Sequence, residues 1–416
     1  MTTVQKSNVL SFIPIKLKIP DKEDLSKVIF GKYEIIKKIG HSSYSSVFLG
    51  KFINKKIYVA VKVQDKNACI SELEKEAYYQ YLLKGFGIPK VLSYGQNRHY
   101  NVLVMTLLGK SIDQLFKMNQ EPNSKMKDLC MVAIQIIDRI QYIHSKNIVH
   151  QDIKPENFLV GNPDTSIIYI IDFGLSKKYR SSRTGRHISF SKNKNFFGSF
   201  NFSSVNSMKG FEMSRRDDLE SIGYMLIYLI KGKLPWSHLE KGKMAERFGP
   251  ILKLKNKTTT EELCKYLPNE FYEYMNYVKS LKFEEKPNYI YLRRLFLSIL
   301  EKMKDKYDLK FSWIKSKKNN NDNISNHNSI LSSLNNFRRK SSPYYKLLNH
   351  LKERSSMIKT MNTESSLLDS SKIKKKHNIY NEENKENKGN NIYNTRSIST
   401  GKQPTTIINK LNKLFW

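Results

Sequence analysis

Short runs of β-branched and aromatic residues recur early in the chain, and turn-forming residues separate them. These runs are residues 33–39, 47–52, 57–63, 90–94 and 101–107. Runs of this length and composition predict the strands of a small antiparallel sheet. Between the third and fourth runs the period changes to four, with Leu73, Ala77 and Tyr81 on one face, and this spacing predicts a helix over residues 71–83.

From about residue 111 onward, apolar residues recur with the period of a helix. The predicted helices cover residues 129–144, 216–230, 261–281 and 289–303. We therefore predict an α+β fold, in which a β-rich lobe over residues 31–108 precedes a larger helical lobe over residues 109–313. Residues 1–30 show no sustained periodicity and form an N-terminal extension.

Residues 314–416 are rich in Asn, Ser and Lys and contain few aromatic or branched apolar residues. Such a segment cannot bury enough apolar surface to offset the entropy of ordering, so we predict a mostly disordered basic tail. Residues 405–416 (TTIINKLNKLFW) could form an amphipathic docking segment, although the composition favours a structureless end.

The formal charge of +34 over 416 residues predicts attraction to polyanions, namely nucleic acid, acidic lipid headgroups, or acidic or phosphorylated peptides. Charge alone does not choose among them. Cys69, Cys130 and Cys264 are far apart and lack metal-ligand spacing, which favours a reducing compartment. No apolar run reaches the ~18 residues of a membrane span. We expect a soluble protein of the cytoplasm, the nucleus or both.

Two polar motifs carry the candidate chemistry. Residues 150–157 read His-Gln-Asp-Ile-Lys-Pro-Glu-Asn, and residues 172–174 read Asp-Phe-Gly. Phosphoryl transfer needs a carboxylate that orients the attacking hydroxyl, a lysine that balances charge, and oxygen ligands for Mg²⁺. We assign the carboxylate to Asp152, the lysine to Lys154, and the metal ligands to Asn157 and Asp172.

Either motif alone would usually be a capped turn or a hairpin bend, but a Val-Ala-Val-Lys run at residues 59–62 precedes both. The combination favours phosphoryl transfer, with Lys62 paired to the α- and β-phosphates of ATP. Lys62 then needs a carboxylate partner, and the predicted helix offers Glu72, Glu74 and Glu76. The apolar run before Asp172 predicts a strand that ends at this residue, and Gly174 permits a sharp turn after it.

Several stretches agree with one family of kinases. They are Tyr-Asn-Val-Leu-Val-Met at 100–105, Leu-Leu-Gly at 107–109, Asp-Phe-Gly-Leu-Ser-Lys-Lys-Tyr-Arg at 172–180, Ser-Val-Asn at 204–206, Ser-Arg-Arg-Asp-Asp-Leu-Glu-Ser at 214–221 and Leu-Pro-Trp at 234–236. Through them the span 31–313 resembles the casein kinase 1 family of serine/threonine protein kinases. Ser-Val-Asn stands where most kinases have Ala-Pro-Glu. The resemblance implies that Asp217 braces the catalytic loop and that Glu76 is the partner of Lys62.

The resemblance also implies a bilobal protein kinase fold with ATP and Mg²⁺ bound between the lobes. Met105 falls at the gatekeeper position, and residues 106–108 form the hinge. The implied nucleotide-binding residues are Ile39, Gly40, His41, Ser42, Ser43, Tyr44, Ser45, Ser46, Val47, Ala60, Lys62, Glu76, Met105, Leu108, Leu159, Ile171 and Asp172.

The chain departs from the family at three places. The phosphate loop keeps only its first glycine, Gly40, and Gln151 replaces an arginine that in many kinases binds a phosphorylated activation segment. We therefore expect a kinase that is active without that phosphate. Asn201 replaces an arginine, and Met244 a lysine, that help the family to bind a phosphate already on the substrate. Lys241 and Lys243 could substitute for the missing lysine.

We expect the partners to be protein substrates with acidic or phosphorylated residues, bound by a basic cluster. The cluster comprises Lys177, Lys178, Arg180, Arg183 and Arg186, which are otherwise solvated surface charges. A monomer is expected, with no membrane anchor because no cysteine follows Cys264. A weakly active pseudokinase scaffold, and a protein that binds nucleic acid through its basic tail, are the alternatives.

The altered phosphate loop yields a prediction for Ser45, which occupies the last glycine position of the motif. Glycine lets backbone N–H groups approach a phosphate without a side chain in the way, so Ser45→Gly should leave phosphate transfer unchanged or raise it. Steady-state kinetics with varied ATP would measure this. A lower kcat/KM for ATP in the variant would contradict the prediction.

Overall fold

The computed structural model describes residues 16–18, 28–29, 31–41, 45–55, 57–66, 72–96, 99–119, 121–240 and 244–314. The predicted N-terminal extension is thus described only in two short strands. The basic tail, with its segment 405–416, lies outside the described residues except for Ile314. Also outside them are Ser42, Ser43, Tyr44, Lys241 and Lys243.

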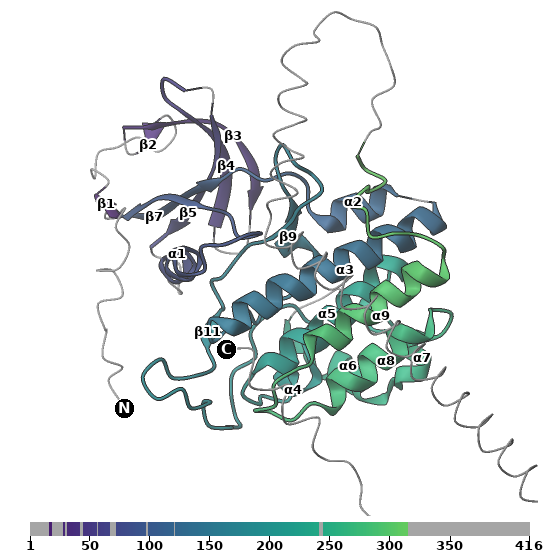
Figure 1. Ribbon diagram of the computed structural model, residues 1–416. Helices are drawn as coiled ribbons and strands as arrows, with labels where there is room; N and C mark the ends of the chain where they lie inside the picture. Colours follow the sequence, from purple (N-terminus) through teal and green to yellow (C-terminus); the bar gives the residue numbers. More distant parts are fainter. Residues whose placement is uncertain are drawn as a thin grey trace, which may run out of the picture. The chain divides into compact units, whose positions relative to one another are not determined.

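A seven-stranded sheet forms the first lobe (Figure 1). Its strands are β1 (Lys16–Lys18), β2 (Val28–Ile29), β3 (Tyr33–His41), β4 (Ser45–Phe52), β5 (Tyr58–Asp65), β6 (Val91–Gln96) and β7 (Tyr100–Thr106). Their order is β1-β6-β7-β5-β4-β3-β2, and every pair is antiparallel except β1 with β6. The five predicted strands and the helix α1 (Glu72–Leu82) are confirmed, whereas β1 and β2 are too short to leave a sequence pattern.

The alternation of side chains along β5 divides the apolar residues of this lobe into two clusters. Val59 and Val61 pack on one face of the sheet with Tyr33. Ala60 packs on the other face, against α1, with Ala77 and the other members of a second cluster. Because residues two apart on a strand share a face, Lys62 lies on the same side as Ala60 and therefore on the side of α1.

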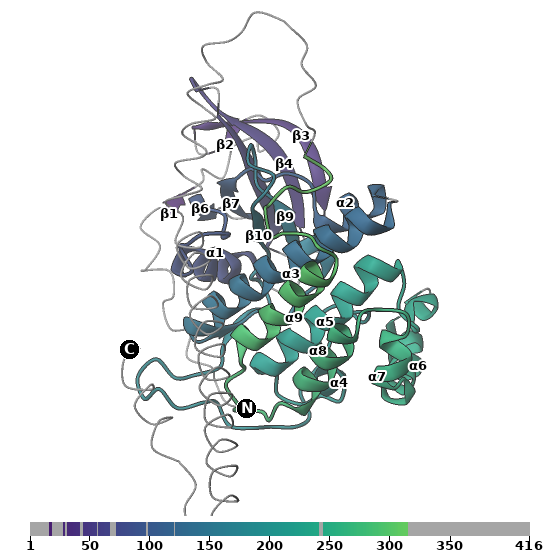
Figure 2. The same cartoon turned by 45° about the vertical axis from the view of Figure 1, so that its right-hand side comes forward.

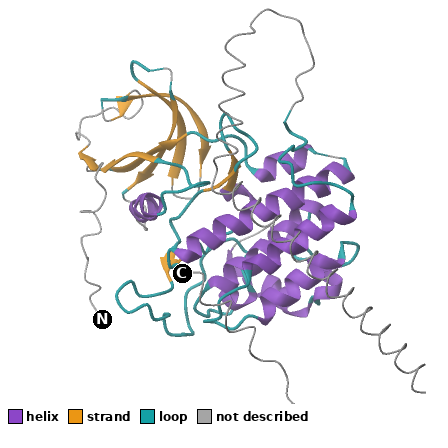
Figure 3. Ribbon diagram, in the orientation of Figure 1, coloured by secondary structure: helices purple, strands orange, loops and turns teal. Residues whose placement is uncertain are grey.

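The second lobe is helical (Figures 2 and 3). Its helices are α2 (Ile112–Met118), α3 (Pro122–Ser145), α4 (Val205–Met208), α5 (Arg215–Lys231), α6 (Met244–Lys257), α7 (Thr260–Cys264), α8 (Asn269–Ser280) and α9 (Tyr289–Lys302). The central helices α3 and α5 pack on each other, α3 also packs on α9, and α5 on α8. The expected order of a β-rich lobe and a larger helical lobe is confirmed.

Short elements between α3 and α5 shape the surface that faces the first lobe. Strands β9 (Phe158–Val160) and β10 (Ile168–Ile170) form one antiparallel pair, and β8 (Ile148–Val149) and β11 (Lys177–Lys178) form another. A 3₁₀ turn, Pro155–Asn157, precedes β9, and a second one, Ser237–Glu240, follows α5. These pairs fix both ends of the loops that carry the two polar motifs.

The prediction of one helix over residues 261–281 is wrong, because two helices, α7 and α8, cover this range. Pro268 lies at the N-cap of α8, and a proline cannot donate the backbone hydrogen bond that would continue α7 through it. Helix α6 was not predicted and contains Pro250. Within the described ranges, no helix combines the length and apolar character needed to cross a membrane.

Candidate active site

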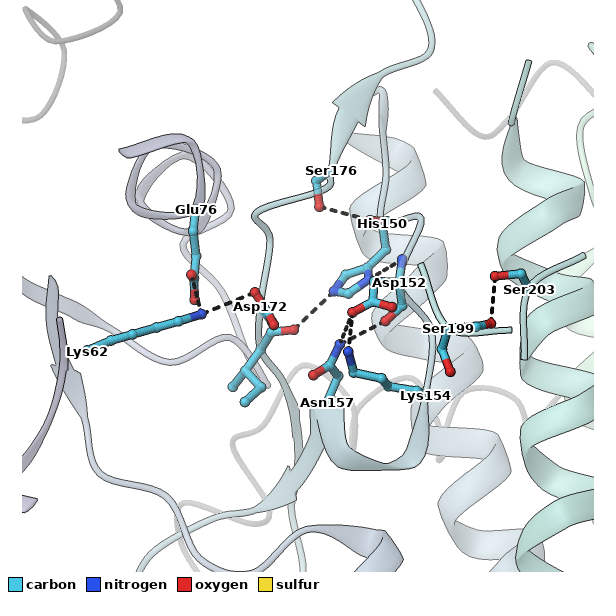
Figure 4. A network of polar contacts seen from close by, with 11 residues as sticks. Lys62, Glu76, His150, Asp152, Lys154, Asn157, Asp172, Ser176, Ser199 and Ser203 are labelled. Carbon is cyan, nitrogen blue, oxygen red and sulfur yellow. Dashed lines mark hydrogen bonds and ion pairs between the residues drawn. The ribbon is translucent and has the colours of Figure 1, made fainter. Parts of the chain in front are cut away.

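An ion pair joins β5 to α1 at the edge of the first lobe (Figure 4). Lys62 Nζ lies 2.6 Å from Glu76 Oε2, and Glu76 is 2% exposed. This pairing confirms the choice of Glu76 over Glu72 and Glu74. Lys62 Nζ also lies 3.2 Å from Asp172 Oδ1, so one ammonium connects both lobes.

Burial and charge act against each other in this group. Burial alone would lower the pKa of Lys62, but the carboxylates of Asp172 and Glu76 outweigh it and raise the pKa, which keeps the ammonium protonated. Burial raises the pKa of Glu76 to about 7, although Lys62 opposes the rise. At Asp172 burial acts in the same direction, but Lys62 and Lys154 outweigh it and lower the pKa.

The loop after β8 brings together Asp152, Lys154 and Asn157, as the sequence predicts (Figure 4). Lys154 Nζ donates to Asp152 Oδ2 at 2.5 Å, and Asn157 Nδ2 donates to the same oxygen at 3.1 Å and to the Asp152 backbone carbonyl at 2.8 Å. Asp152 Oδ1 is buried and has no hydrogen-bond partner among the described residues. Because a buried carboxylate oxygen is costly without a donor, this atom is the natural acceptor for a hydroxyl of a bound molecule.

Asp218, and not Asp217, braces this loop, so the expectation for Asp217 is wrong. Asp218 accepts hydrogen bonds from the backbone N–H of His150 at 2.8 Å and of Gln151 at 2.9 Å. Its Oδ2 also lies 2.9 Å from His144 Nε2. Burial works to raise the pKa of Asp218, but the hydrogen bond from His144 and nearby charges outweigh it and lower the pKa.

Asp217 instead holds the segment that leads from the Asp-Phe-Gly motif to α4, which corresponds to the activation segment of kinases, at its end near Ser204. It accepts from the Ser204 hydroxyl at 2.7 Å and from the Ser214 backbone N–H at 2.8 Å, and burial raises its pKa to about 6. Consecutive residues on a helix point in directions about 100° apart, so adjacent acids on α5 reach different loops. Sequence adjacency alone does not tell the two roles apart.

The Asp-Phe-Gly motif follows β10 as predicted, and its backbone is more constrained than expected. Asp172 has a φ of 67°, in the left-handed region, while Phe173 is fully buried with its ring centroid 5.2 Å from that of His150. The predicted turn is confirmed, since Ser176 N donates to Phe173 O at 3.1 Å. Gly174 lies close to α1, because an added Cβ there would lie 3.1 Å from Glu72 Cβ and would push this neighbour away by a few tenths of an ångström.

The oxygen atoms of Asn157 and Asp172 suit a magnesium ion. Asn157 directs its amide nitrogen to Asp152, which turns its carbonyl oxygen the other way, and the Asp172 carboxylate is held ionised by lysines. Among the described residues no group of three or more His, Cys, Asp or Glu side chains forms a metal cage. Magnesium commonly binds through one or two protein oxygens together with phosphates and water, so the pair fits the ion.

The expected nucleotide residues come from both lobes, and those of the sheet lie near Lys62. Cross-strand pairing aligns Val47 with Lys62 and Ala60 with Met105, which places these side chains on one face of the sheet. Ile39 lies at an irregularity of the β3–β4 register and is 47% exposed.

The other expected nucleotide residues lie at the β3–β4 end of the sheet, in the segment between the lobes, and in the second lobe. Gly40 pairs with Val47 and His41 with Ser46 where β3 meets β4, and Ser45 begins β4 opposite Gln64. Leu108 follows β7 in the segment between the lobes. Leu159 lies in β9, and Ile171 N donates to Asn157 O at 3.0 Å. Binding of a nucleotide by all these residues stays a prediction.

Two buried histidines belong to the site, although the sequence reasoning gave them no role. His150 Nε2 lies 3.1 Å from Ile171 O and Asp152 N donates to His150 Nδ1 at 3.3 Å, so this ring links the two motifs. His144 lies between Asp218 and the Tyr289 hydroxyl, and burial lowers its pKa. His150 is the first residue of the motif at 150–157, so its position could have indicated a role in the site. The sequence around His144 carries no such indication.

The family model described as "Protein kinase domain" matches residues 33–290. This range is more than half of the chain. It runs from β3 to the start of α9 and includes Lys62, Glu76, both polar motifs and Asp218.

The neighbouring acids of α5 give a matched pair of variants. In Asp218→Asn an amide N–H₂ would face a backbone N–H donor, so the hydrogen bonds to residues 150 and 151 should weaken and their amides should exchange about 10 to 100 times faster. In Asp217→Asn the faster exchange should appear at Ser214 instead. Amide hydrogen exchange would measure both. Faster exchange at residues 150 and 151 in Asp217→Asn alone would contradict this assignment.

Proposed function

The chain belongs to the protein kinase family, and we propose that it is a serine/threonine kinase of the casein kinase 1 type that acts on acidic protein substrates. The observation that carries this proposal is the position of Lys62 between Glu76 and Asp172, opposite a buried and unpaired Asp152 oxygen. Phosphoryl transfer depends mainly on such positioning and on charge. The resemblance of residues 100–105 and 172–180 to casein kinase 1 supports the finer assignment.

Each polar residue has a part in the proposed reaction. Lys62 holds the α- and β-phosphates of ATP, and Asn157 and Asp172 hold magnesium. When bound, this ion supplies positive charge against the phosphate oxygens. Asp152 Oδ1 accepts the hydrogen bond of the substrate hydroxyl and then its proton. The hydroxyl oxygen bonds to the γ-phosphorus as the bond from this phosphorus to the β,γ-bridging oxygen breaks, and that oxygen leaves with ADP. Lys154 balances the charge of the transferred group.

A basic loop in the activation segment supports acidic substrates. Lys178, Arg180, Arg183 and Arg186 form no ion pair with a described carboxylate, and the three arginines are exposed. Lys177 is different from the rest of the cluster, because it forms an ion pair with Glu212. Burial lowers the pKa of Lys177 to about 8, and Lys194 adds to the effect. We therefore assign substrate recognition to the other four residues, which can form charge-assisted hydrogen bonds with Asp and Glu.

We propose that a phosphate on the substrate is not required. Asn201, which replaces the family's arginine, is 3% exposed, and its backbone carbonyl accepts from Trp236 Nε1 at 2.9 Å. A neutral side chain buried in this way is a poor ligand for a phosphate dianion. We also propose activity without a phosphate on the activation segment, since the Lys62–Glu76 pair forms in the unmodified chain. The cytoplasm, the nucleus or both are the proposed locations.

The glycine-poor phosphate loop motivates the pseudokinase alternative. A scaffold without activity would have little reason to retain Lys62, Asp152 and Asp172 in hydrogen-bonding geometry. One assay separates an active serine/threonine kinase from a scaffold. It measures the transfer of labelled phosphate to acidic peptides that differ only in having Ser, Thr or Tyr as the acceptor. We expect label on Ser and Thr, and about 10² to 10⁴ times less in Asp152→Asn. Absence of transfer by the wild type would favour the scaffold, and transfer to Tyr alone would contradict the acceptor assignment.

Replacement of Glu76 by Gln tests the pair that carries the proposal. The isosteric amide cannot neutralise Lys62, so the ammonium should turn toward Asp172 and the phosphate-transfer kcat should fall by about 100-fold. Glu74→Gln, on the same helix but without an ion pair to Lys62, is the matched control and should retain activity. An equal fall of kcat in Glu76→Gln and Glu74→Gln would mean that the substitutions disturb α1 itself and not the Lys62–Glu76 ion pair.

A further inference from the structure

A groove of about 880 Å³ lies in the helical lobe, where the start of α3, the end of α5, residues 233–238 and the turn after α7 meet. None of its lining residues belongs to the candidate active site or to the basic loop of the activation segment. Its apolar lining includes Met126, Ile230, Leu234, Leu263 and Leu267. This volume is typical of ligand sites and can receive a few side chains of a partner.

The charge of the groove is strongly one-sided. Lys125, Lys231, Lys233 and Lys265 line it, and none of them forms an ion pair with a carboxylate in the described part of the chain. Glu262 is the acidic residue of the lining, and it accepts a hydrogen bond from the backbone N–H of Thr259 at 3.1 Å as part of a capping box. Four lysines next to apolar side chains therefore lack a carboxylate counterpart.

The rim carries an aromatic residue in an unfavourable backbone conformation. Leu267 N donates to Cys264 O at 3.0 Å, which closes a turn with Lys265 and Tyr266 as its central residues. Lys265 has φ −51° and ψ 134°, and Tyr266 has φ 64°, the angles of a type II turn. Glycine is favoured at the second central position, yet Tyr266 stands there and is 90% exposed. Among the described residues its ring contacts the Lys265 ammonium, which lies 4.9 Å from the ring centroid, and the rest of the side chain is open to solvent.

The groove is also held in shape without a ligand. Lys231 Nζ donates to the backbone carbonyl of Leu263 at 2.8 Å and so ties α5 to α7, while its ammonium still reaches the lining. Leu234 and Leu263 are each 2% exposed. A preformed site loses less conformational freedom when a partner binds.

We propose that this groove is a docking site for an acidic peptide segment of a partner protein. A large apolar side chain of the segment enters between Met126 and Leu267, its Asp and Glu residues face the four lysines, and Tyr266 packs over the bound chain. Charge complementarity selects this occupant. The chain's own residues 315–416 carry twenty Lys and Arg against seven Asp and Glu, so they match the groove poorly. An anionic bilayer is flat at this scale and fits a concave groove less well than a peptide.

Fluorescence anisotropy with the full chain tests the proposal. The probe is a short labelled peptide in which Asp and Glu flank a central Phe-Leu pair, and the reference probe has Ser in place of Phe and Leu. We expect the wild type to bind the first probe more tightly, and Lys233→Glu with Lys265→Glu to weaken this binding by about tenfold or more. The same charge change in Lys32→Glu with Lys37→Glu, in the first lobe, should have little effect.

Tyr266→Gly separates docking from stability. Glycine relieves the left-handed strain, so the melting temperature should stay unchanged or rise while the peptide affinity falls. The proposal would be overturned if both double lysine variants lost the same affinity for the first probe, or if the wild type bound both probes equally well. Either result would mean that the interaction is general charge attraction. Binding to phosphatidylserine vesicles that depends on Lys233 and Lys265, without peptide binding, would also overturn it. None of these outcomes depends on phosphate transfer.

Discussion

The Lys62 ammonium, enclosed by the carboxylates of Glu76 and Asp172, is the interaction on which the rest of the site depends. A buried charge that loses its partner costs about 3–5 kcal/mol, so the three groups hold one another in place. They come from β5, from α1 and from the segment after β10. The pair therefore sets the rotation of α1 and the position of Asp172 at the same time, and it ties the sheet to the helical lobe.

The first turns of α5 provide the second fixed point. Asp217, Asp218 and Glu220 are all nearly fully buried there, and each accepts from loop atoms. Asp218 holds the catalytic loop, Asp217 holds Ser204, and Glu220 accepts from Val205 N at 3.0 Å. Buried carboxylates need donors, and irregular loops need acceptors for their N–H groups. One helix thereby fixes the catalytic loop and the end of the activation segment relative to each other.

Periodicity predicted most of the fold because the apolar residues that report it are the ones that pack, as Val59, Val61 and Ala60 show on β5. It could not predict the break at Pro268, where the apolar pattern of α7 runs on in phase into α8. Residue types at fixed offsets predicted that Lys62, Asp152 and Asn157 would carry the chemistry. Residue types at fixed offsets could not assign the separate roles of Asp217 and Asp218. Which acid holds the loop of residues 150–157 depends on the rotation of α5 and on the loop that each side chain reaches.

Backbone conformation adds information that the sequence pattern lacks. Gln151 and Asp172 both have positive φ, at a cost of order 1–3 kcal/mol each, and both are fixed by partners, through Asp218 and Lys62 respectively. Asn147 also has positive φ, but asparagine adopts this conformation readily. Tyr266 has positive φ as well, but it has neither a buried partner that fixes it nor the conformational tolerance of asparagine. Its side chain is bulky and almost fully exposed. Strain that persists in a fold needs compensation, and at Tyr266 the described part of the chain provides a contact between its ring and the Lys265 ammonium. Lys265 also lines the groove, so the strained residue and the lysines of the groove belong to one surface.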